Sequence, residues 1–418
     1  MMLTLPNRLL VLGLAMGFEE HELAPEIQAY LDESDLICGF PATLAALQAQ
    51  QAEKAATHTF WPLKLPLEPC LAELEKKRAQ GLRLVLVAGG DPLFYGLGST
   101  LARFFPPEKL HILPAASALQ LACARLALPV ETLDVLSLHG RPGWQELDAA
   151  LLRQKHLGLL LDREHSPAEV ARHLREKGCQ NYCLHICADL GRKSETITHC
   201  SVDEALSYQG QGQITLILEC QERRARPHLG LEEHLLSEGN GYASSLTVRS
   251  TALALLAVQA EDVFWDIGSG SGAVALEAAS LAPRGAVYAV EARQERADAI
   301  VRRAQKLGAC NLNVLQGKAP DCLAALPAPS RIFVGGGLSG NNAQELLKSL
   351  CQRLRPGGRL VTSCVLLASF QASLEFCQSL RWPLRILQVQ ASEARPLANN
   401  LHFQAENPVF LLCTERLS

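Results

Sequence analysis

The sequence predicts an α/β protein in which a two-lobed amino-terminal part precedes a doubly wound carboxyl-terminal sheet. Short apolar strands alternate with helical segments along most of the chain, which is typical of largely parallel sheets covered by helices. In the second half, a glycine-rich turn from Gly268 to Gly272 joins an apolar strand to a helix. Such a turn at a strand-to-helix junction is typical of nucleotide-binding sheets.

Length and composition narrow the class of protein. The 418 residues exceed one ordinary core, so two or three domains are expected. A chain that is 48% hydrophobic and 20% charged is globular and not disordered. The formal net charge of -4 gives no general attraction to nucleic acid. No apolar run reaches the roughly 20 residues that a membrane span needs.

The cysteine content and the amino terminus indicate the cellular compartment of the protein. The first residues lack the basic start and long apolar segment of a secretory signal. Fourteen cysteines without such a signal indicate reduced thiols in the cytoplasm. Cys183, His185 and Cys187 alternate along an expected strand and therefore share one face, where a metal site is geometrically conceivable. The alternative is a row of buried, weakly polar thiols, and no metal is expected.

The elements of the first domain follow from apolar runs and their spacing. So many strands in about 220 residues favour two small lobes over one sheet. The expected strands are 9–14, 35–38, 82–88, 110–113, 135–138, 157–161, 182–186 and 213–218, with helices at 71–80, 117–128, 144–154 and 167–177.

A polar stretch after residue 220 interrupts the pattern. The predicted domains are therefore 1–222 and 246–418, joined by a linker at 223–245. Three basic residues, Arg223, Arg224 and Arg226, are expected to be solvated there, with phosphate binding as the alternative. The second domain is expected to hold strands at 263–267, 287–290, 312–315, 331–334, 360–364, 384–389 and 409–413 and helices at 273–281, 294–306, 343–354 and 368–379, with an antiparallel strand in the closing pair.

Three expected strand ends of the second domain carry ligand-type residues: Asp266, Glu291 and Gly317. In doubly wound sheets the ligand binds beyond the carboxyl ends of the strands. Glycines permit positive φ and a close backbone approach. An acidic residue at the next strand end is placed to accept hydrogen bonds from ribose hydroxyls. The second domain is therefore predicted to bind a nucleoside.

With these features the second domain resembles Rossmann-type S-adenosylmethionine methyltransferases, and among them the decarboxylating methyltransferase domain of cobalamin biosynthesis. The matching segments are 265–272, 290–292, 311–314, 317–320, 333–337 and 407–410. The resemblance implies that the glycines hold the amino-acid part of the cofactor, that Glu291 holds the ribose, and that 317–319 border the adenine. The implied cofactor residues are Asp266, Gly268, Ser269, Gly270, Gly272, Glu291, Ala292, Gly317, Lys318 and Ala319. Glu277 on the following helix is interpreted as structural, with a catalytic base as the alternative.

The first domain resembles the tetrapyrrole methylase superfamily through segments 88–96, 113–118, 124–126 and 137–142. The implied cofactor residues are Gly89, Gly90, Asp91, Phe94, Tyr95 and Ser117. Asp91 before Pro92, and Ser117, also suit the N-cap of a helix, a role compatible with cofactor binding. The implied substrate contacts are His139, Arg141 and, in the second domain, Arg249. For Arg141 a surface ion pair is the alternative.

Together the two unlike methylase domains resemble the fused methyltransferases of cobalamin biosynthesis. The resemblance implies S-adenosylmethionine at two sites per chain and a precorrin of the 6Y type, methylated at two bridging carbons with decarboxylation of an acetate arm. It also implies a homo-oligomer without nucleic acid or membrane partners. No residue is identified as the catalytic base.

The chain departs from the family pattern at two places. Gly13 to Gly17 reads Gly-Leu-Ala-Met-Gly where Gly-x-Gly-Pro-Gly is usual, and Ala252 stands where an arginine is usual. The altered loop leaves open a first domain that only docks the macrocycle beside one active methyltransferase. The residues also leave open an RNA methyltransferase and an NAD-dependent dehydrogenase.

Overall fold

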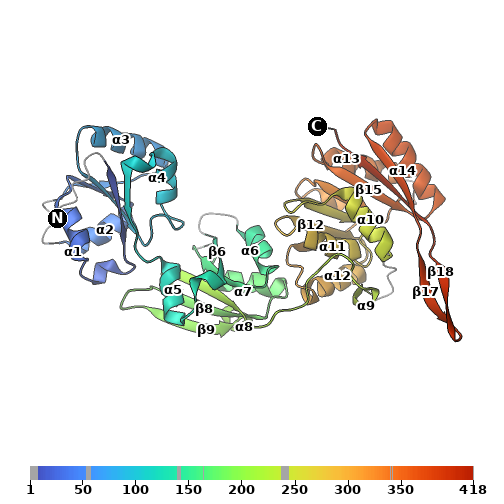
Figure 1. The fold of residues 1–418 in the computed structure, drawn as a ribbon, viewed down its shortest axis with the longest axis horizontal. Helices are drawn as coiled ribbons and strands as arrows, with labels where there is room; N and C mark the ends of the chain where they lie inside the picture. Colours follow the sequence, from blue (N-terminus) through green and yellow to red (C-terminus); the bar gives the residue numbers. More distant parts are fainter. Residues whose placement is uncertain are drawn as a thin grey trace. The chain divides into compact units, whose positions relative to one another are not determined.

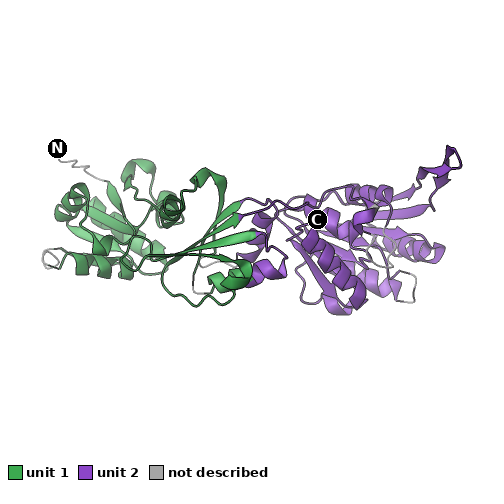
Figure 2. Cartoon of the chain, turned by 90° about the horizontal axis from the view of Figure 1, so that it is seen from below, with its two compact units in different colours: residues 1–141, 156–171, 182–219 green, residues 142–155, 172–181, 220–418 purple. Residues whose placement is uncertain are grey.

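The computed structural model describes residues 8–52, 58–138, 143–162, 164–236, 244–338, 340 and 342–417. Two compact units divide the chain (Figures 1 and 2). Unit 1 holds residues 1–141, 156–171 and 182–219, and unit 2 holds 142–155, 172–181 and 220–418. The units divide the chain differently from the predicted boundary at residue 222, because two short segments of the first domain group with the second.

The first lobe of unit 1 is a parallel sheet covered on both faces. Its strands are β1 (Leu9–Leu14), β2 (Leu36–Gly39), β3 (Phe60–Pro62), β4 (Leu84–Gly89) and β5 (Leu110–Leu113), in the order β3-β2-β4-β1-β5. Leu9 and Val11 of β1 belong to one core cluster, whereas Leu12 and Leu14 belong to another. This alternation places one cluster on each face of the sheet. The helices are α1 (Pro25–Asp32), α2 (Pro41–Gln50), α3 (Leu67–Ala79) and α4 (Gly98–Phe104).

The second lobe is built on a mixed sheet. Its strands are β6 (Leu133–Ser137), β7 (His156–Leu160), β8 (Tyr182–Ala188), β9 (Thr196–Ser201) and β10 (Ile214–Cys220), in the order β6-β7-β10-β8-β9. β6 and β7 are parallel, but β10 is antiparallel to β7 and β9 is antiparallel to β8. The expectation of largely parallel sheets is therefore wrong for this lobe. The helices that precede or separate these strands in sequence are α5 (Ala118–Leu126), α6 (Trp144–Leu151), α7 (Pro167–Glu176) and α8 (Val202–Ala205).

Unit 2 contains the predicted doubly wound sheet. Its strands are β11 (Val263–Ile267), β12 (Ala286–Glu291), β13 (Leu312–Gln316), β14 (Arg331–Val334), β15 (Arg359–Cys364), β16 (Leu384–Val389) and β19 (Val409–Glu415), in the order β13-β12-β11-β14-β15-β19-β16. β19 is antiparallel to both neighbours, as expected for the closing pair. The predicted α/β architecture, a two-lobed part followed by this sheet, is confirmed.

Helices cover both faces of the unit 2 sheet. Phe264 packs with α10 (Leu246–Leu256), α11 (Ala273–Leu281) and α12 (Gln294–Lys306). Trp265, which points to the other face, packs with α13 (Ala343–Arg353) and α14 (Leu367–Leu380). A short helix α9 (Glu233–Leu236) precedes them. A two-stranded hairpin, β17 (Ser392–Leu397) and β18 (Asn400–Ala405), interrupts the path from β16 to β19.

The linker arginines are bound and not simply solvated. The Arg224 side chain donates to the carbonyl of Gly178, and its backbone N–H donates to Gln154. Arg226 donates to the carbonyl of Arg153. All these groups belong to unit 2. The expected solvated stretch is therefore wrong at Arg224, which is half-buried, whereas Arg226 is exposed as expected. Both arginines tie the linker to the ends of α6 and α7.

The structure also tests the expectations about membrane spans, cysteines and metal ligands. Within the described ranges, every helix is too short or too polar to cross a lipid bilayer. All fourteen cysteines lie in the described ranges, and each is a thiol outside any disulfide bond. His185 contacts His199 and Glu219, while the Cys183 thiol donates to the carbonyl of Cys200. Among the described residues, no three His, Cys, Asp or Glu side chains gather so that they could hold a metal.

Candidate active sites

A cavity of about 530 Å³ lies at the carboxyl ends of the central strands of unit 2. Its volume falls within the range that small-ligand sites occupy. Six residues predicted to touch the cofactor line it: Gly268, Glu291, Ala292, Gly317, Lys318 and Ala319. They come from three strand ends, since β11, β12 and β13 are parallel neighbours. The structure thus brings together, at the carboxyl ends of the strands, six residues that lie up to about 50 positions apart in the sequence.

The glycine turn supports this cavity through its backbone. Gly268, Gly270 and Gly272 have φ of 70°, 57° and 77°, in the left-handed region that side chains disfavour. A Cβ at Gly272 would lie 2.8 Å from the Ile300 side chain, so glycine is also required for packing there. Gly270, Gly272 and Ser269 shape the turn without lining the cavity, because only Gly268 of the turn does.

Glu291 fixes the turn to the end of β12. One of its carboxylate oxygens accepts the N–H of Gly270 at 2.9 Å, and the other accepts the N–H of Arg293 at 3.0 Å. Each oxygen keeps a further lone pair that can accept a hydroxyl. Glu291 is buried and lines the cavity. This arrangement fits a residue that holds a ribose diol.

Asp266 lies beneath the turn and is wholly buried. Its Oδ2 accepts the N–H of Ala275 at 3.2 Å in the first turn of α11, whereas its Oδ1 has no partner. Burial raises the pKa of Asp266 to about 7, although the hydrogen bonds from Ala275 and Ser269 act in the other direction. Asp266 therefore anchors the first turn of α11 beneath the glycine turn, and it does not itself line the cavity.

Arg249 does not face the cavity. Its side chain on α10 is wholly buried, and its Nε donates to Glu277 on α11 at 2.9 Å. The two remaining nitrogens donate to the carbonyls of Ser244 and Leu231. The guanidinium is thus fully engaged inside the protein, which contradicts the expected substrate contact. The same pair supports the structural interpretation of Glu277.

A second cavity, of about 720 Å³, lies within unit 1. Five predicted cofactor residues line it: Gly89, Gly90, Asp91, Phe94 and Tyr95. The Tyr95 hydroxyl donates to the carbonyl of Val135 at 3.1 Å, and Tyr95 adopts a positive φ of 52°. The residues therefore form one wall at the carboxyl end of β4.

The two expected caps have different outcomes. Asp91 does not cap a helix, because α4 begins only at Gly98. Its Oδ1 accepts the N–H of Leu93 at 2.8 Å in a turn. Ser117 is the N-cap of α5 and exchanges hydrogen bonds with Gln120 in a capping box. Ser117 itself does not line the cavity, whereas the adjacent Ala118 does.

The altered loop after β1 is tightly packed. A Cβ at Gly13 would lie 2.5 Å from the nitrogen of Ala115, and one at Gly17 would lie 2.2 Å from the carbonyl oxygen of Gly191. Both glycines that the chain shares with the family pattern are therefore sterically required. Met16, which stands where proline is usual, lines the cavity. Its side chain is the physical difference between this wall and that of a Gly-x-Gly-Pro-Gly loop.

Several lining residues carry no prediction from the sequence. They include Arg103 and Thr215 in the unit 1 cavity and Arg296, Asn342 and Glu345 in the unit 2 cavity. They lie on segments without a motif, so no local signal marks them. His139 and Arg141 lie outside the described residues.

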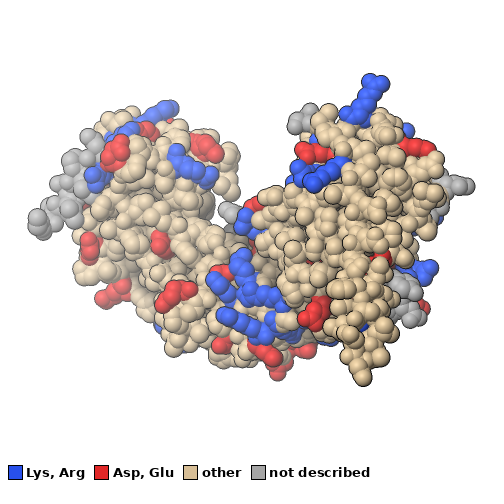
Figure 3. Space-filling view, turned by 45° about the vertical axis from the view of Figure 1, so that its right-hand side comes forward, with Lys and Arg blue, Asp and Glu red and all other residues tan. Residues whose placement is uncertain are grey.

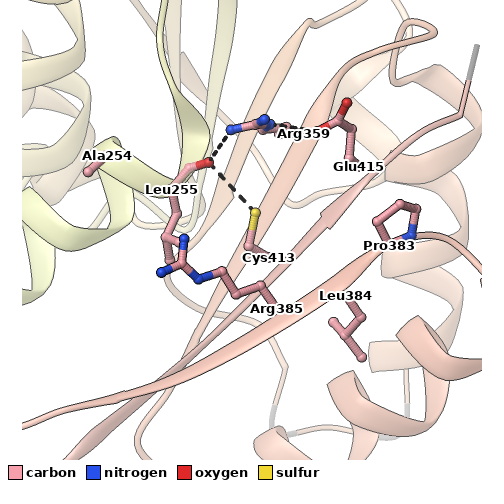
Figure 4. Close-up of a pocket in the computed structure, with 8 residues that line it drawn as sticks. All are labelled: Ala254, Leu255, Arg359, Pro383, Leu384, Arg385, Cys413 and Glu415. Carbon is pink, nitrogen blue, oxygen red and sulfur yellow. Dashed lines mark hydrogen bonds and ion pairs between the residues drawn. The ribbon is translucent and has the colours of Figure 1, made fainter.

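A third, smaller cavity of about 230 Å³ lies at the opposite end of the unit 2 strands, where β15 begins (Figure 4). Arg359 pairs there with Glu415 at 2.9 Å and donates to the carbonyl of Leu255 at 3.1 Å. These bonds tie α10 to β15 and β19. This cavity lies away from the strand ends that carry the glycine turn.

Comparison with known proteins follows the division into two domains. Residues 13–206 match the tetrapyrrole (corrin/porphyrin) methylases, and residues 238–416 match the precorrin methyltransferase domain. A precorrin-6Y C(5,15)-methyltransferase (decarboxylating) from Sinorhizobium sp is 32% identical over 304 residues, 72% of this chain and 72% of that protein. The chain belongs to the precorrin-6Y C(5,15)-methyltransferase (decarboxylating) family.

Two further relatives show how far this likeness extends. A member of the precorrin-6Y methyltransferase family from Mycobacterium tuberculosis is 28% identical over 399 residues, 94% of this chain and 95% of its own. A probable cobalt-precorrin-6B C(15)-methyltransferase (decarboxylating) from Pyrobaculum calidifontis is 32% identical over 186 residues, 44% of this chain and 94% of its own. The predicted resemblance is confirmed, and the family identifies the chain as an S-adenosylmethionine-dependent methyltransferase.

Proposed function

We propose that this protein methylates a precorrin of the 6Y type at two bridging carbons and removes the carboxyl group of an acetate arm during cobalamin biosynthesis. The observation that carries the proposal is the family likeness over 94% of the chain. Two separate cavities, one in each unit and each beside strand-end glycines, support it.

The chemistry asks mainly for positioning. Bound S-adenosylmethionine would supply a methyl group by in-line displacement, with the electron-rich bridging carbon of a reduced tetrapyrrole as the nucleophile and S-adenosylhomocysteine as the leaving group. Correct orientation can lower such a barrier by about 7–11 kcal/mol. In unit 2 the glycine turn anchored by Glu291 would hold the cofactor in that orientation. A proton acceptor is then needed to restore conjugation and contributes on the order of 100-fold or more.

We further propose two cofactor sites in each chain. Calorimetric titration with S-adenosylmethionine is expected to give a stoichiometry near two, and Glu291→Gln is expected to weaken only one of the two binding events. A stoichiometry near one for the wild-type chain contradicts this proposal. Supplying the reduced precorrin with labelled cofactor then tests the function, because two methyl groups gained and one carbon dioxide released are expected for each substrate.

One observation favours a second candidate for unit 1. Met16 places a thioether side chain in the cavity wall where the family has a proline. A unit 1 that only docks the macrocycle predicts one methyl group transferred per substrate and one cofactor site. The same two experiments therefore decide between the candidates.

The partners are proposed on the same basis. We propose a cytoplasmic homo-oligomer that acts without nucleic acid or a membrane. On the face drawn in Figure 3, one compact group of Lys and Arg side chains has acidic residues at its border, and elsewhere the two signs are scattered. An RNA methyltransferase would favour a continuous basic stripe along the path of the phosphates.

A further inference from the structure

Arg103 is the single basic side chain among the described residues that line the unit 1 cavity. The single acidic one there is Asp91, whose Oδ1 accepts the N–H of Leu93. Within the described chain, the Arg103 guanidinium has hydrogen-bond partners on its own helix and no carboxylate at ion-pair distance. The cavity therefore contains a positive charge that the protein itself does not neutralise.

Most donors of this guanidinium remain available to a ligand. Its Nε donates to the carbonyl of Ser99 at 3.3 Å, and its Nη2 donates weakly to the Thr100 hydroxyl at 3.5 Å. Both N–H groups of Nη1 and the second N–H of Nη2 are left over. A planar fork of this kind binds a carboxylate through two parallel hydrogen bonds.

α4 presents a hydroxyl group beside Arg103. Ser99 and Thr100 precede Arg103 by four and three residues, so all three side chains share one face of the helix, and all three line the cavity. The Ser99 hydroxyl donates to the carbonyl of Gly96 at 3.1 Å. The Thr100 hydroxyl accepts from Arg103 and can donate its own hydrogen to the same ligand. This face thus offers a carboxylate one charged and one neutral donor.

Much of the remaining cavity wall is apolar. Leu93 and Phe94 come from the segment after β4, and Leu160, Leu161 and Ile214 come from the second lobe. Binding sites of this kind use apolar walls for contact area and a few polar groups for orientation. A ligand that combines an apolar ring with carboxylate arms matches this wall. The reduced tetrapyrrole of the proposed function is such a ligand.

Two ligands of the proposed reaction carry carboxylates, namely the amino-acid part of S-adenosylmethionine and the arms of the macrocycle. The implied cofactor residues Gly89, Gly90 and Asp91 lie at the end of β4, whereas Arg103 lies in the last turn of α4. The unit 1 cavity of about 720 Å³ is also larger than the unit 2 cavity of about 530 Å³, which is proposed to hold the same cofactor. Position and volume therefore both favour the macrocycle.

We propose that Arg103 binds a carboxylate arm of the tetrapyrrole in the unit 1 cavity and thereby orients the ring toward the cofactor. This inference rests on the proposed function, which supplies the identity of the ligand. The structural alternative is an arginine that only stabilises the last turn of α4, where a cation is favourable. That alternative predicts a loss of stability in Arg103 variants and no dependence on the charge of the ligand.

Fluorescence titration of the full chain with two porphyrins tests the proposal. One porphyrin carries carboxylate arms, and the matched one carries the same arms as uncharged amides. Arg103→Gln is expected to weaken one binding event of the carboxylate porphyrin about tenfold or more, as the loss of a hydrogen bond to a charged group does. The affinity for the amide porphyrin is expected to change less than about twofold. Arg103→Lys keeps the charge without the fork and is expected to lose about threefold.

Lys193→Gln is the matched control, because it removes an exposed cation of unit 1 that does not line the cavity. It is expected to leave both porphyrin affinities unchanged. Arg103→Gln is expected to keep the melting temperature and the affinity for S-adenosylmethionine of the wild type, since Arg103 is exposed and is assigned to the macrocycle.

Four outcomes overturn the proposal. They are a wild-type chain that binds neither porphyrin, an Arg103→Gln variant that binds the carboxylate porphyrin as the wild type does, and equal weakening of both porphyrins. The fourth is a loss of affinity for S-adenosylmethionine alone, which would assign the guanidinium to the cofactor. Failure of the proposed function is recognised separately. If the reduced precorrin gains no methyl group while the carboxylate porphyrin still binds through Arg103, the function is wrong and the carboxylate site stands.

Discussion

Asp266 combines complete burial with a carboxyl oxygen that has no partner. Because burial raises its pKa in the folded protein to about 7, the protonated form favours folding. This stabilisation is complete below about pH 4 and is lost as the pH rises from there through about 7. Asp266→Asn, which stays neutral, is expected to remove that slope, a change on the order of a few kcal/mol in unfolding free energy between about pH 4 and 8. Urea unfolding across this range measures it, and an unchanged slope contradicts the assignment.

Glu291 allows a matched test at the neighbouring strand end. Glu291 accepts two backbone N–H groups, and Glu291→Gln keeps one oxygen and replaces the other by an amide donor, so the N–H of either Gly270 or Arg293 loses its acceptor. The affinity of the unit 2 site for S-adenosylmethionine is expected to fall about tenfold or more, as it does when a buried hydrogen bond to a charged group is lost. The exposed Glu295→Gln on α12 serves as the control and should leave the affinity unchanged. Equal affinities in both variants would contradict a role of Glu291 in cofactor binding.

Single residues also show what the sequence can and cannot predict. Glu291 and the glycines are predictable because they combine a strand end with a special chemistry. The prediction for Arg249 is wrong because its guanidinium pairs inside the protein with Glu277, 28 residues away, and the sequence gives no sign of that partner. Arg103 and Arg296 carry no signal, since each lines its cavity only through the fold.

Two helices of unit 2 are joined by the buried Arg249–Glu277 pair. Arg249→Met would leave the Glu277 carboxylate buried without its partner, and is expected to destabilise the protein by about 3–5 kcal/mol. Adding Glu277→Leu is expected to recover a substantial part, because the unpaired charge is removed. The exposed pair of Arg284 and Glu261 is the control, and Arg284→Met should cost about 1 kcal/mol or less. Thermal unfolding of these variants and the wild type compares the two pairs. A loss no larger at Arg249 than at Arg284 contradicts the expected role.

Elements are predictable where an apolar pattern marks them. The expected bounds of β1, β11, β14, β16 and α12 agree with the structure. β9 and the hairpin escape prediction because most of their residues are exposed, so neither shows the apolar run that identifies the other strands. α10 escapes it because the helix adjoins the expected linker. The mixed second sheet differs from the parallel one expected because alternation with helices does not reveal the direction of β10.

The whole chain is more interwoven than a simple fusion of two enzymes. Within unit 2, Cys179 from the end of α7 lies 3.3 Å from Cys310 between their sulfur atoms, and Lys177 donates to Asn313 at 2.9 Å. A fragment of residues 223–418 lacks these partners. Cys310, which is buried in the full chain, is therefore expected to react with maleimide at least about tenfold faster in the fragment, because exchange and labelling follow local opening. Mass spectrometry of labelled peptides measures the rates, with buried Cys351 as the internal reference. Equal rates for Cys310 in the two proteins contradict this expectation.

The chain crosses from one unit to the other after residues 141, 155, 171, 181 and 219. The polypeptide therefore alternates between the two units before it forms the carboxyl-terminal sheet. No single cut in the backbone can release one body whole, so transplanting the second methyltransferase into another host protein requires carrying α6 and the tail of α7 along with it. A recombination point at the boundary between the two family matches would separate residues 142–155 and 172–181 from unit 2 and expose the surface that they cover.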